Sequence, residues 1–193
     1  MASKPAIPKF GLAIDWETSG YSLPSYAANH QGISFGAVVF DLVTLAPIDE
    51  LYCEIKFDPK YKWEDEAEKI HGLSRSYLEQ NGISQEDAAI QLGTMVLKYF
   101  GDGKVMILGH RVWFDEAFTD QLMNVVDLEI KYDPIRLDSA AISVLLLEIQ
   151  RSDDIFDVLG LPPRGEHNAL EDVIYTLESM RKLKEIFIRG LSV

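Results

Sequence analysis

Two acidic residues, two positions apart, end an apolar run near the N-terminus. The run is "FGLAI", and "DWETSG" follows it directly and supplies Asp15 and Glu17. In a β-strand, residues i and i+2 point to the same face, so these two carboxylates lie close together. Such carboxylates repel one another unless a cation or a proton intervenes, and Mg²⁺ prefers oxygen ligands of this kind. The pair predicts a metal site, with a solvated strand end as the alternative.

A third acid falls at the start of a predicted helix. In "LGHRVWFDEAF", a buried-type strand ends at Gly109, and a helix begins at Val112 or Trp113. Asp115 then lies in the first turn, where the helix dipole alone favours acidic residues. Aromatic residues flank it, which predicts partial burial, and a partly buried carboxylate needs a partner. Both a dipole contact and a metal contact are therefore open for this residue.

A histidine and a fourth acid meet at another helix start, in "GEHNALEDV". Asn168 is a good N-cap, and Glu171 three residues later completes a pattern like a capping box. This spacing makes His167 the residue before the cap and Asp172 the fourth helical residue, positions whose side chains meet. The alternative to a catalytic pair is a structural contact between the histidine and the aspartate.

Four acids and one histidine thus stand at the ends of predicted elements. This combination suits hydrolysis of a phosphodiester by two metal ions. Carboxylates hold two cations roughly 4 Å apart, and these stabilise the attacking and leaving oxygens. A histidine can take the proton of the attacking water because its pKa lies near neutrality.

The apolar pattern also predicts the elements that position these residues. Three strands come first, and helices then alternate with a further strand, which predicts a mixed α/β sheet covered by helices in one domain over residues 1–193. The predicted strands are 9–15, 33–44, 51–57 and 104–110. The predicted helices are 84–100, 113–126, 138–150 and 168–188, and one that begins at Lys62 and is stopped by Gly72.

Composition narrows the class of protein. The 193 residues are 47% hydrophobic, enough for one sizeable core. A net charge of −13 argues against a protein that binds along the grooves of duplex nucleic acid. It does not argue against an enzyme that binds only a few nucleotides through metal ions. Cys53 is the one cysteine, which fits a reducing compartment. With no apolar leader and no apolar stretch of membrane length, we expect a cytoplasmic protein without a membrane span.

Three ordered motifs, "DWETSG", "GHRVWFD" and "HNALED", make the chain similar to a known family. They resemble the motifs of the DEDDh 3′→5′ exonucleases, which include the proofreading subunit of bacterial replicative polymerases, oligoribonuclease and ribonuclease T. "KIHGLS", "RLDSA" and "DVLGLPP" extend the likeness from about Phe10 to Met180. The resemblance implies a ribonuclease H-like fold, with a mixed five-stranded sheet flanked by helices.

The resemblance also implies roles for the five residues and a cofactor of two Mg²⁺ (or Mn²⁺) ions. Asp15 would bridge both ions. Glu17 and Asp172 would hold the ion that activates water. Asp115 would serve the second ion, and His167 would be the general base.

The implied partners are single-stranded 3′ ends of DNA or RNA, with a homodimer or docking to a polymerase or other nucleic-acid enzyme as further partners. For each implied substrate contact, core or loop packing is the alternative. The sequence departs from the family at Arg111, which replaces the usual Asn of the second motif. This arginine either contacts a phosphate or is simply an exposed side chain at a helix start. The implied substrate-binding residues are Trp16, Thr18, Tyr21, Leu23, His71 and Phe114.

Two other functions stay open. One is a non-catalytic nucleic-acid-binding or adaptor module that retains the exonuclease fold. The other is a phosphatase with an aspartyl nucleophile in an Asp-x-Asp-x-Thr motif, which Glu17 disfavours because it is the wrong acid for the second position.

Overall fold

The computed structural model describes residues 8–21, 26–164 and 168–191, and a five-stranded sheet runs through its centre. The strand order is β3-β2-β1-β4-β5, in which the pairs β1–β2 and β2–β3 are antiparallel and the pairs β1–β4 and β4–β5 are parallel. The prediction of a mixed five-stranded sheet flanked by helices is confirmed. The strands are β1 (Phe10–Thr18), β2 (Gly32–Asp41), β3 (Pro47–Glu54), β4 (Ile107–Gly109) and β5 (Leu137–Asp138).

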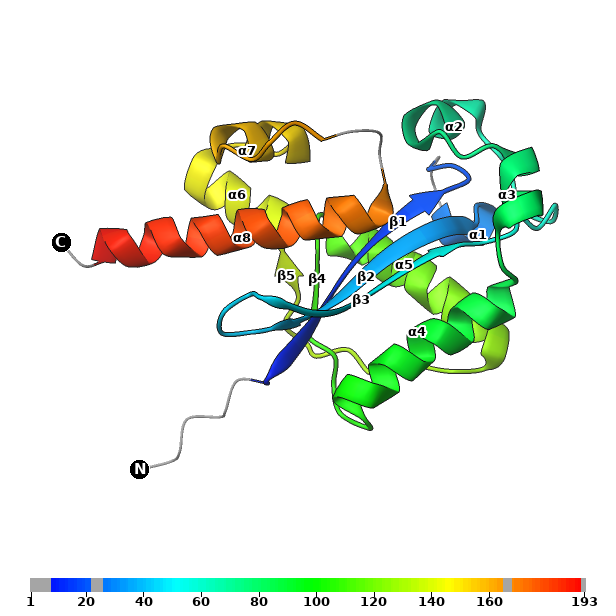
Figure 1. The fold of residues 1–193 in the computed structure, drawn as a ribbon, viewed down its shortest axis with the longest axis horizontal. Helices are drawn as coiled ribbons and strands as arrows, with labels where there is room; N and C mark the ends of the chain where they lie inside the picture. The colour runs from blue at the N-terminus through cyan, green and yellow to red at the C-terminus, as the bar shows by residue number, and fades with distance from the viewer. Residues whose placement is uncertain (1–7, 22–25, 165–167, 192–193) are drawn as a thin grey trace.

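Helices cover both faces of this sheet (Figure 1). The bounds of the described helices are α1 (Tyr26–Asn29), α2 (Asp65–His71), α3 (Arg75–Asn81), α4 (Gln85–Phe100), α5 (Val112–Met123), the 3₁₀ helix η1 (Asn124–Val126), α6 (Ser139–Leu147), α7 (Ser152–Val158) and α8 (Ala169–Leu191). None of these described helices has the length and apolar character that crossing a bilayer requires.

Strand β1 is apolar on both sides because it separates two cores. Leu12 and Ile14 face the core that α4 and α5 cover, whereas Ala13 faces the core that α8 covers. A central strand buried on both faces reads as a continuous apolar run, which explains the "FGLAI" stretch. Its carboxyl end is the part of the strand that reaches the acidic residues.

Several boundaries differ from the sequence prediction. Strand β1 extends to Thr18, beyond the predicted end at Asp15, so Glu17 also lies within the strand. Strand β5 has only two residues, and α3 and α7 have seven each, so none contains enough turns or alternations to give a periodic signal. These short elements exist because their neighbours in space support them.

The start of α8 is the predicted one. The side-chain oxygen of Asn168 accepts hydrogen bonds from the backbone N–H groups of Leu170, at 3.1 Å, and Glu171, at 3.3 Å. This confirms Asn168 as the N-cap.

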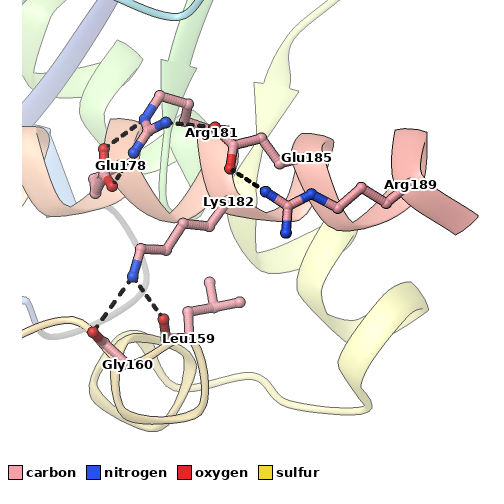
Figure 2. Close-up of polar contacts among 7 residues, drawn as sticks. All are labelled: Leu159, Gly160, Glu178, Arg181, Lys182, Glu185 and Arg189. Carbon is pink, nitrogen blue, oxygen red and sulfur yellow. Dashed lines mark hydrogen bonds and ion pairs between the residues drawn. The ribbon is translucent and has the colours of Figure 1, made fainter.

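Charged residues from the middle of α8 to near its C-terminus pair along the helix (Figure 2). The guanidinium of Arg181 contacts both Glu178 and Glu185, at 2.5 Å each. Glu185 also lies 3.8 Å from the guanidinium of Arg189. The paired residues are three or four positions apart, so they are neighbours on the helix surface. Pairs at this spacing stabilise even an isolated helix.

Candidate active site

The side chains of two acidic residues of β1, Asp15 and Glu17, lie on the face of the sheet that α8 covers. In the β1–β2 ladder, Asp15 lies opposite Gly36 and Glu17 lies opposite Ser34. A Cβ atom built on Gly36 would lie only 2.3 Å from the backbone Cα of Leu170, so this glycine lets the first turn of α8 rest directly on the sheet. That close approach brings the start of α8 to the acidic end of β1.

The result is a cluster of three carboxylates, which we call the carboxylate cluster. One oxygen from each of Asp15, Glu17 and Asp172 lies within 4.8 Å of the others. Two unit charges at about this separation repel by on the order of 3 kcal/mol when the effective dielectric constant is about 20. All three side chains are half-buried, so water screens them only in part.

This crowding changes the acidity of the cluster. Burial, followed by the charges of Glu17 and Asp172, holds the pKa of Asp15 well above its usual range. Burial and then the charge of Asp172 raise the pKa of Glu17 to about 7. Arg164 acts in the opposite direction on both groups. Near neutral pH, Glu17 therefore retains its proton in part unless a cation replaces it.

Asp115 approaches from α5 but lies outside the set of three. It is 2% exposed, and its Oδ2 atom has no hydrogen-bond partner among the described residues. Burial first, and then the charge of Asp15, raises the pKa of Asp115 well above its usual range. A Cβ atom on Gly109 would lie 2.9 Å from that Oδ2 atom, so the glycine keeps the space beside it open.

These residues fit a divalent metal ion of the Mg²⁺ type. Such ions take carboxylate oxygens, and a half-buried set of converging carboxylates with an unpartnered buried oxygen beside it supplies that donor chemistry. Asp15, Glu17 and Asp172 would hold the metal, and the unpartnered oxygen of Asp115 on α5 would be a further candidate ligand.

Asp138, at the end of β5, positions the helix that carries Asp115. Its carboxylate accepts hydrogen bonds from the backbone N–H groups of Arg111 and Val112, at 3.3 and 3.2 Å, where α5 begins. It also caps the start of α6. Arg111 adopts a left-handed conformation, with φ of 63°, and its side chain is exposed. The sequence signal for this role was the "RLDSA" segment, where an aspartate precedes a helix.

Arg164 is the site residue that sequence reasoning missed. Its guanidinium donates to carboxylate oxygens of Asp172 in the cluster and of Asp153 on α7. The sequence showed "LPPRG" only as a rigid loop, with no spacing that linked the arginine to the acids.

Two of the residues predicted to contact substrate, Trp16 and His71, are buried in the structure. Trp16 points into the core, where its indole N–H donates to the hydroxyl of Thr119 at 3.0 Å and its ring packs 4.8 Å from that of Phe35. His71 is also buried, and its Nδ1 atom accepts the backbone N–H of Leu73 at 3.0 Å. Rings that are 5% and 4% exposed have no face free to stack on a base.

The other predicted contacts differ in how accessible they are. Thr18 is buried and donates to the backbone carbonyl of Gly20 at 3.0 Å. Phe114 is half-buried and packs against Phe118, with ring centroids 4.9 Å apart. Tyr21 is 50% exposed, so its ring is available to a ligand.

Two predicted residues, Leu23 and His167, lie outside the described residues. The roles assigned to them stay predictions.

We expect metal to stabilise the protein more at pH 8 than at pH 5.5. The folded-state pKa of Glu17, about 7, exceeds its ordinary value of 4.5, so the folded state binds more protons than the unfolded state between these values. The metal-free protein therefore loses stability as pH rises through this window, because the carboxylate of Glu17 becomes charged. A bound cation neutralises that charge and so prevents the loss. Melting temperatures in EDTA and in Mn²⁺ at both pH values test this; an equal Mn²⁺ effect at both would contradict it.

Comparison with known proteins gives a family match and fold matches. The family model described as exonuclease (RNase_T) matches residues 12–180. No match was found among curated proteins.

Solved structures share the fold at low sequence identity. One is a 3′-exonuclease in a structure of histone mRNA stem-loop recognition, with 16% identity, a TM-score of 0.72, and coverage of 93% of this chain and 83% of that one. Another is the zinc-bound complex of E. coli exonuclease I with single-stranded DNA, with 19% identity and a TM-score of 0.74. The match covers 92% of this chain but spans only 41% of exonuclease I.

Proposed function

Because the chain belongs to the exonuclease family whose model matches residues 12–180, we propose that it removes nucleotides from the 3′ ends of single-stranded nucleic acid with the help of divalent metal ions. The prediction of a DEDD-type 3′→5′ exonuclease of the ribonuclease H-like superfamily is itself confirmed. The observation that carries the proposal is the carboxylate cluster at the carboxyl end of β1.

The proposed cofactor is a pair of Mg²⁺ or Mn²⁺ ions. When bound, such ions stabilise charge on the attacking and leaving oxygens of a phosphodiester. Asp15, Glu17 and Asp172 would supply the oxygens that hold the ions, and Asp115 would add the buried oxygen beside Gly109. The Asp138 carboxylate holds the start of α5, and thereby Asp115, in place.

His167 is the proposed general base. It precedes Asn168, the N-cap of α8, and so stands in sequence at the helix start that carries Asp172. The imidazole takes a proton from water, the water oxygen bonds to phosphorus, and the bond from phosphorus to the 3′ oxygen of the preceding nucleotide breaks. That oxygen gains a proton, so the products are a nucleoside 5′-monophosphate and a strand shortened by one nucleotide.

The proposed substrate is a single strand rather than a long duplex. With a net charge of −13, the chain gains little affinity from counterion release along a duplex. The exposed ring of Tyr21 offers a stacking surface for a base, and the exposed guanidinium of Arg111 offers a phosphate contact. The similar structures were solved with single-stranded DNA and in the context of an RNA stem-loop, so both polymers are candidates.

The test is hydrolysis of 5′-labelled single-stranded DNA and RNA of equal sequence in Mg²⁺, Mn²⁺ or EDTA. We expect a ladder that shortens from the 3′ end and disappears in EDTA, with the faster polymer identifying the substrate class. Oligomers with a blocked 3′ end and blunt duplexes are the matched controls and should be cut more slowly. Binding of both polymers without cleavage under any metal condition would instead support the non-catalytic module.

A further inference from the structure

A largely buried arginine side chain lies against the carboxylate cluster. The side chain of Arg164 is 10% exposed, and its guanidinium lies over the ring of Phe156, 5.1 Å from the ring centroid. One nitrogen donates to Asp172 in the cluster and another donates to Asp153 on α7. The arginine therefore places a fixed positive charge beside carboxylates that would otherwise repel one another.

The segment that carries this arginine is anchored at its other end. The backbone N–H of Leu161 donates to the carbonyl of Phe156 at 2.9 Å as α7 ends. The ammonium of Lys182 on α8 donates to the carbonyls of Leu159, at 2.8 Å, and Gly160, at 3.3 Å (Figure 2). Two prolines, Pro162 and Pro163, then limit the backbone up to Arg164.

We propose that Arg164 is a built-in counter-ion of the carboxylate cluster, which a divalent metal ion must displace from Asp172 in order to bind. This inference rests on the proposed function, because it assigns the cluster to metal binding. A carboxylate oxygen that accepts a guanidinium hydrogen bond is less available to a metal, so the two cations compete for Asp172. Asp153 gives the displaced guanidinium a second carboxylate, which keeps it beside the site.

Two consequences follow for the protein. Without metal, Arg164 offsets part of the repulsion among the acids, in line with its lowering effect on the pKa values of Asp15 and Glu17. When metal is present, the ion pair between Arg164 and Asp172 weakens metal binding. Arg164 therefore sets the metal concentration at which the site fills.

The test is calorimetric titration with Mn²⁺ of the wild type and the variants Arg164→Met, Arg164→Lys and Arg181→Met. We expect Arg164→Met to bind Mn²⁺ about tenfold more tightly, within the range typical of coupled sites. Arg164→Lys keeps the charge and should stay close to the wild type. Arg181 is the matched control, because it also contacts two carboxylates, those of Glu178 and Glu185 (Figure 2), and neither belongs to the cluster. Its variant should bind Mn²⁺ like the wild type.

A second measurement needs only the wild type and the lysine variant. In protein with ¹⁵N-labelled arginine, the side-chain signal of Arg164, assigned by its loss in Arg164→Lys, should move as Mg²⁺ fills the site. Equal Mn²⁺ affinity in the wild type and Arg164→Met, or a fixed Arg164 signal while Mg²⁺ binds, would overturn this inference and leave the proposed function intact. Failure of the wild type to bind either ion would overturn both.

Discussion

Asp15→Asn should reduce hydrolysis by at least about a thousandfold, which corresponds to about 4 kcal/mol of lost transition-state stabilisation. The substitution keeps the shape of the side chain but removes one charge from the carboxylate cluster, and with it a ligand for the proposed metal ions. The metal-free variant should be at least as stable as the wild type, because the raised pKa of Asp15 shows that its charge is unfavourable there. Steady-state cleavage of the labelled strand and melting in EDTA measure the two effects.

The control for this variant is Asp102→Asn. Asp102 is exposed in the turn after α4 and lies outside the carboxylate cluster, so both its activity and its melting temperature should match the wild type. Full activity in Asp15→Asn would show that hydrolysis does not depend on the carboxylate cluster. A lower melting temperature in EDTA would show that the charge of Asp15 contributes to stability.

Gly36→Ala should destabilise the fold by about 3 kcal/mol or more, since overpacking of this kind typically costs about 1–3 kcal/mol and here no flexible side chain can yield. The added Cβ atom would lie 2.3 Å from the Cα and 2.4 Å from the nitrogen of Leu170, which are backbone atoms of α8. For a chain of this size, such a loss lowers the melting temperature by roughly 6–12 °C. Thermal unfolding followed by circular dichroism measures it.

The same substitution should reduce hydrolysis by about a hundredfold, because it moves the helix that carries Asp172 and catalysis is sensitive to displacements of about 1 Å. Gly190→Ala on α8 is the matched control: a Cβ atom there meets nothing within 4 Å, and alanine favours a helix. It should leave activity unchanged and melting unchanged or slightly higher. If Gly36→Ala melts and cleaves like the control, the contact between α8 and the sheet does not position the site.

Local patterns in the sequence were enough to predict the parts of the site that depend on near neighbours. The alternation of a strand put Asp15 and Glu17 on one face, and the structure has them there. The side chain of Asn168 marked the start of α8, which fixed the turn that carries Asp172. The aromatic neighbours of Asp115 indicated partial burial near the start of α5, and the structure buries the residue more fully, at 2% exposed. Each inference needed only the few residues around it.

Only the tertiary structure decided how these local pieces meet. Trp16 is buried in part because its indole N–H bonds to Thr119, which is 103 residues away in the sequence. The pattern of a strand alone does not show that helices cover both of its faces. The two-residue strand β5 exists because β4 pairs with it, and Gly36 matters because α8 lies on it. Arg164 reaches the cluster through α7 and a proline-containing loop, so no sequence period links it to the acids. Contacts between distant segments depend on the whole packed chain, and for this protein they determine the charge balance of the site.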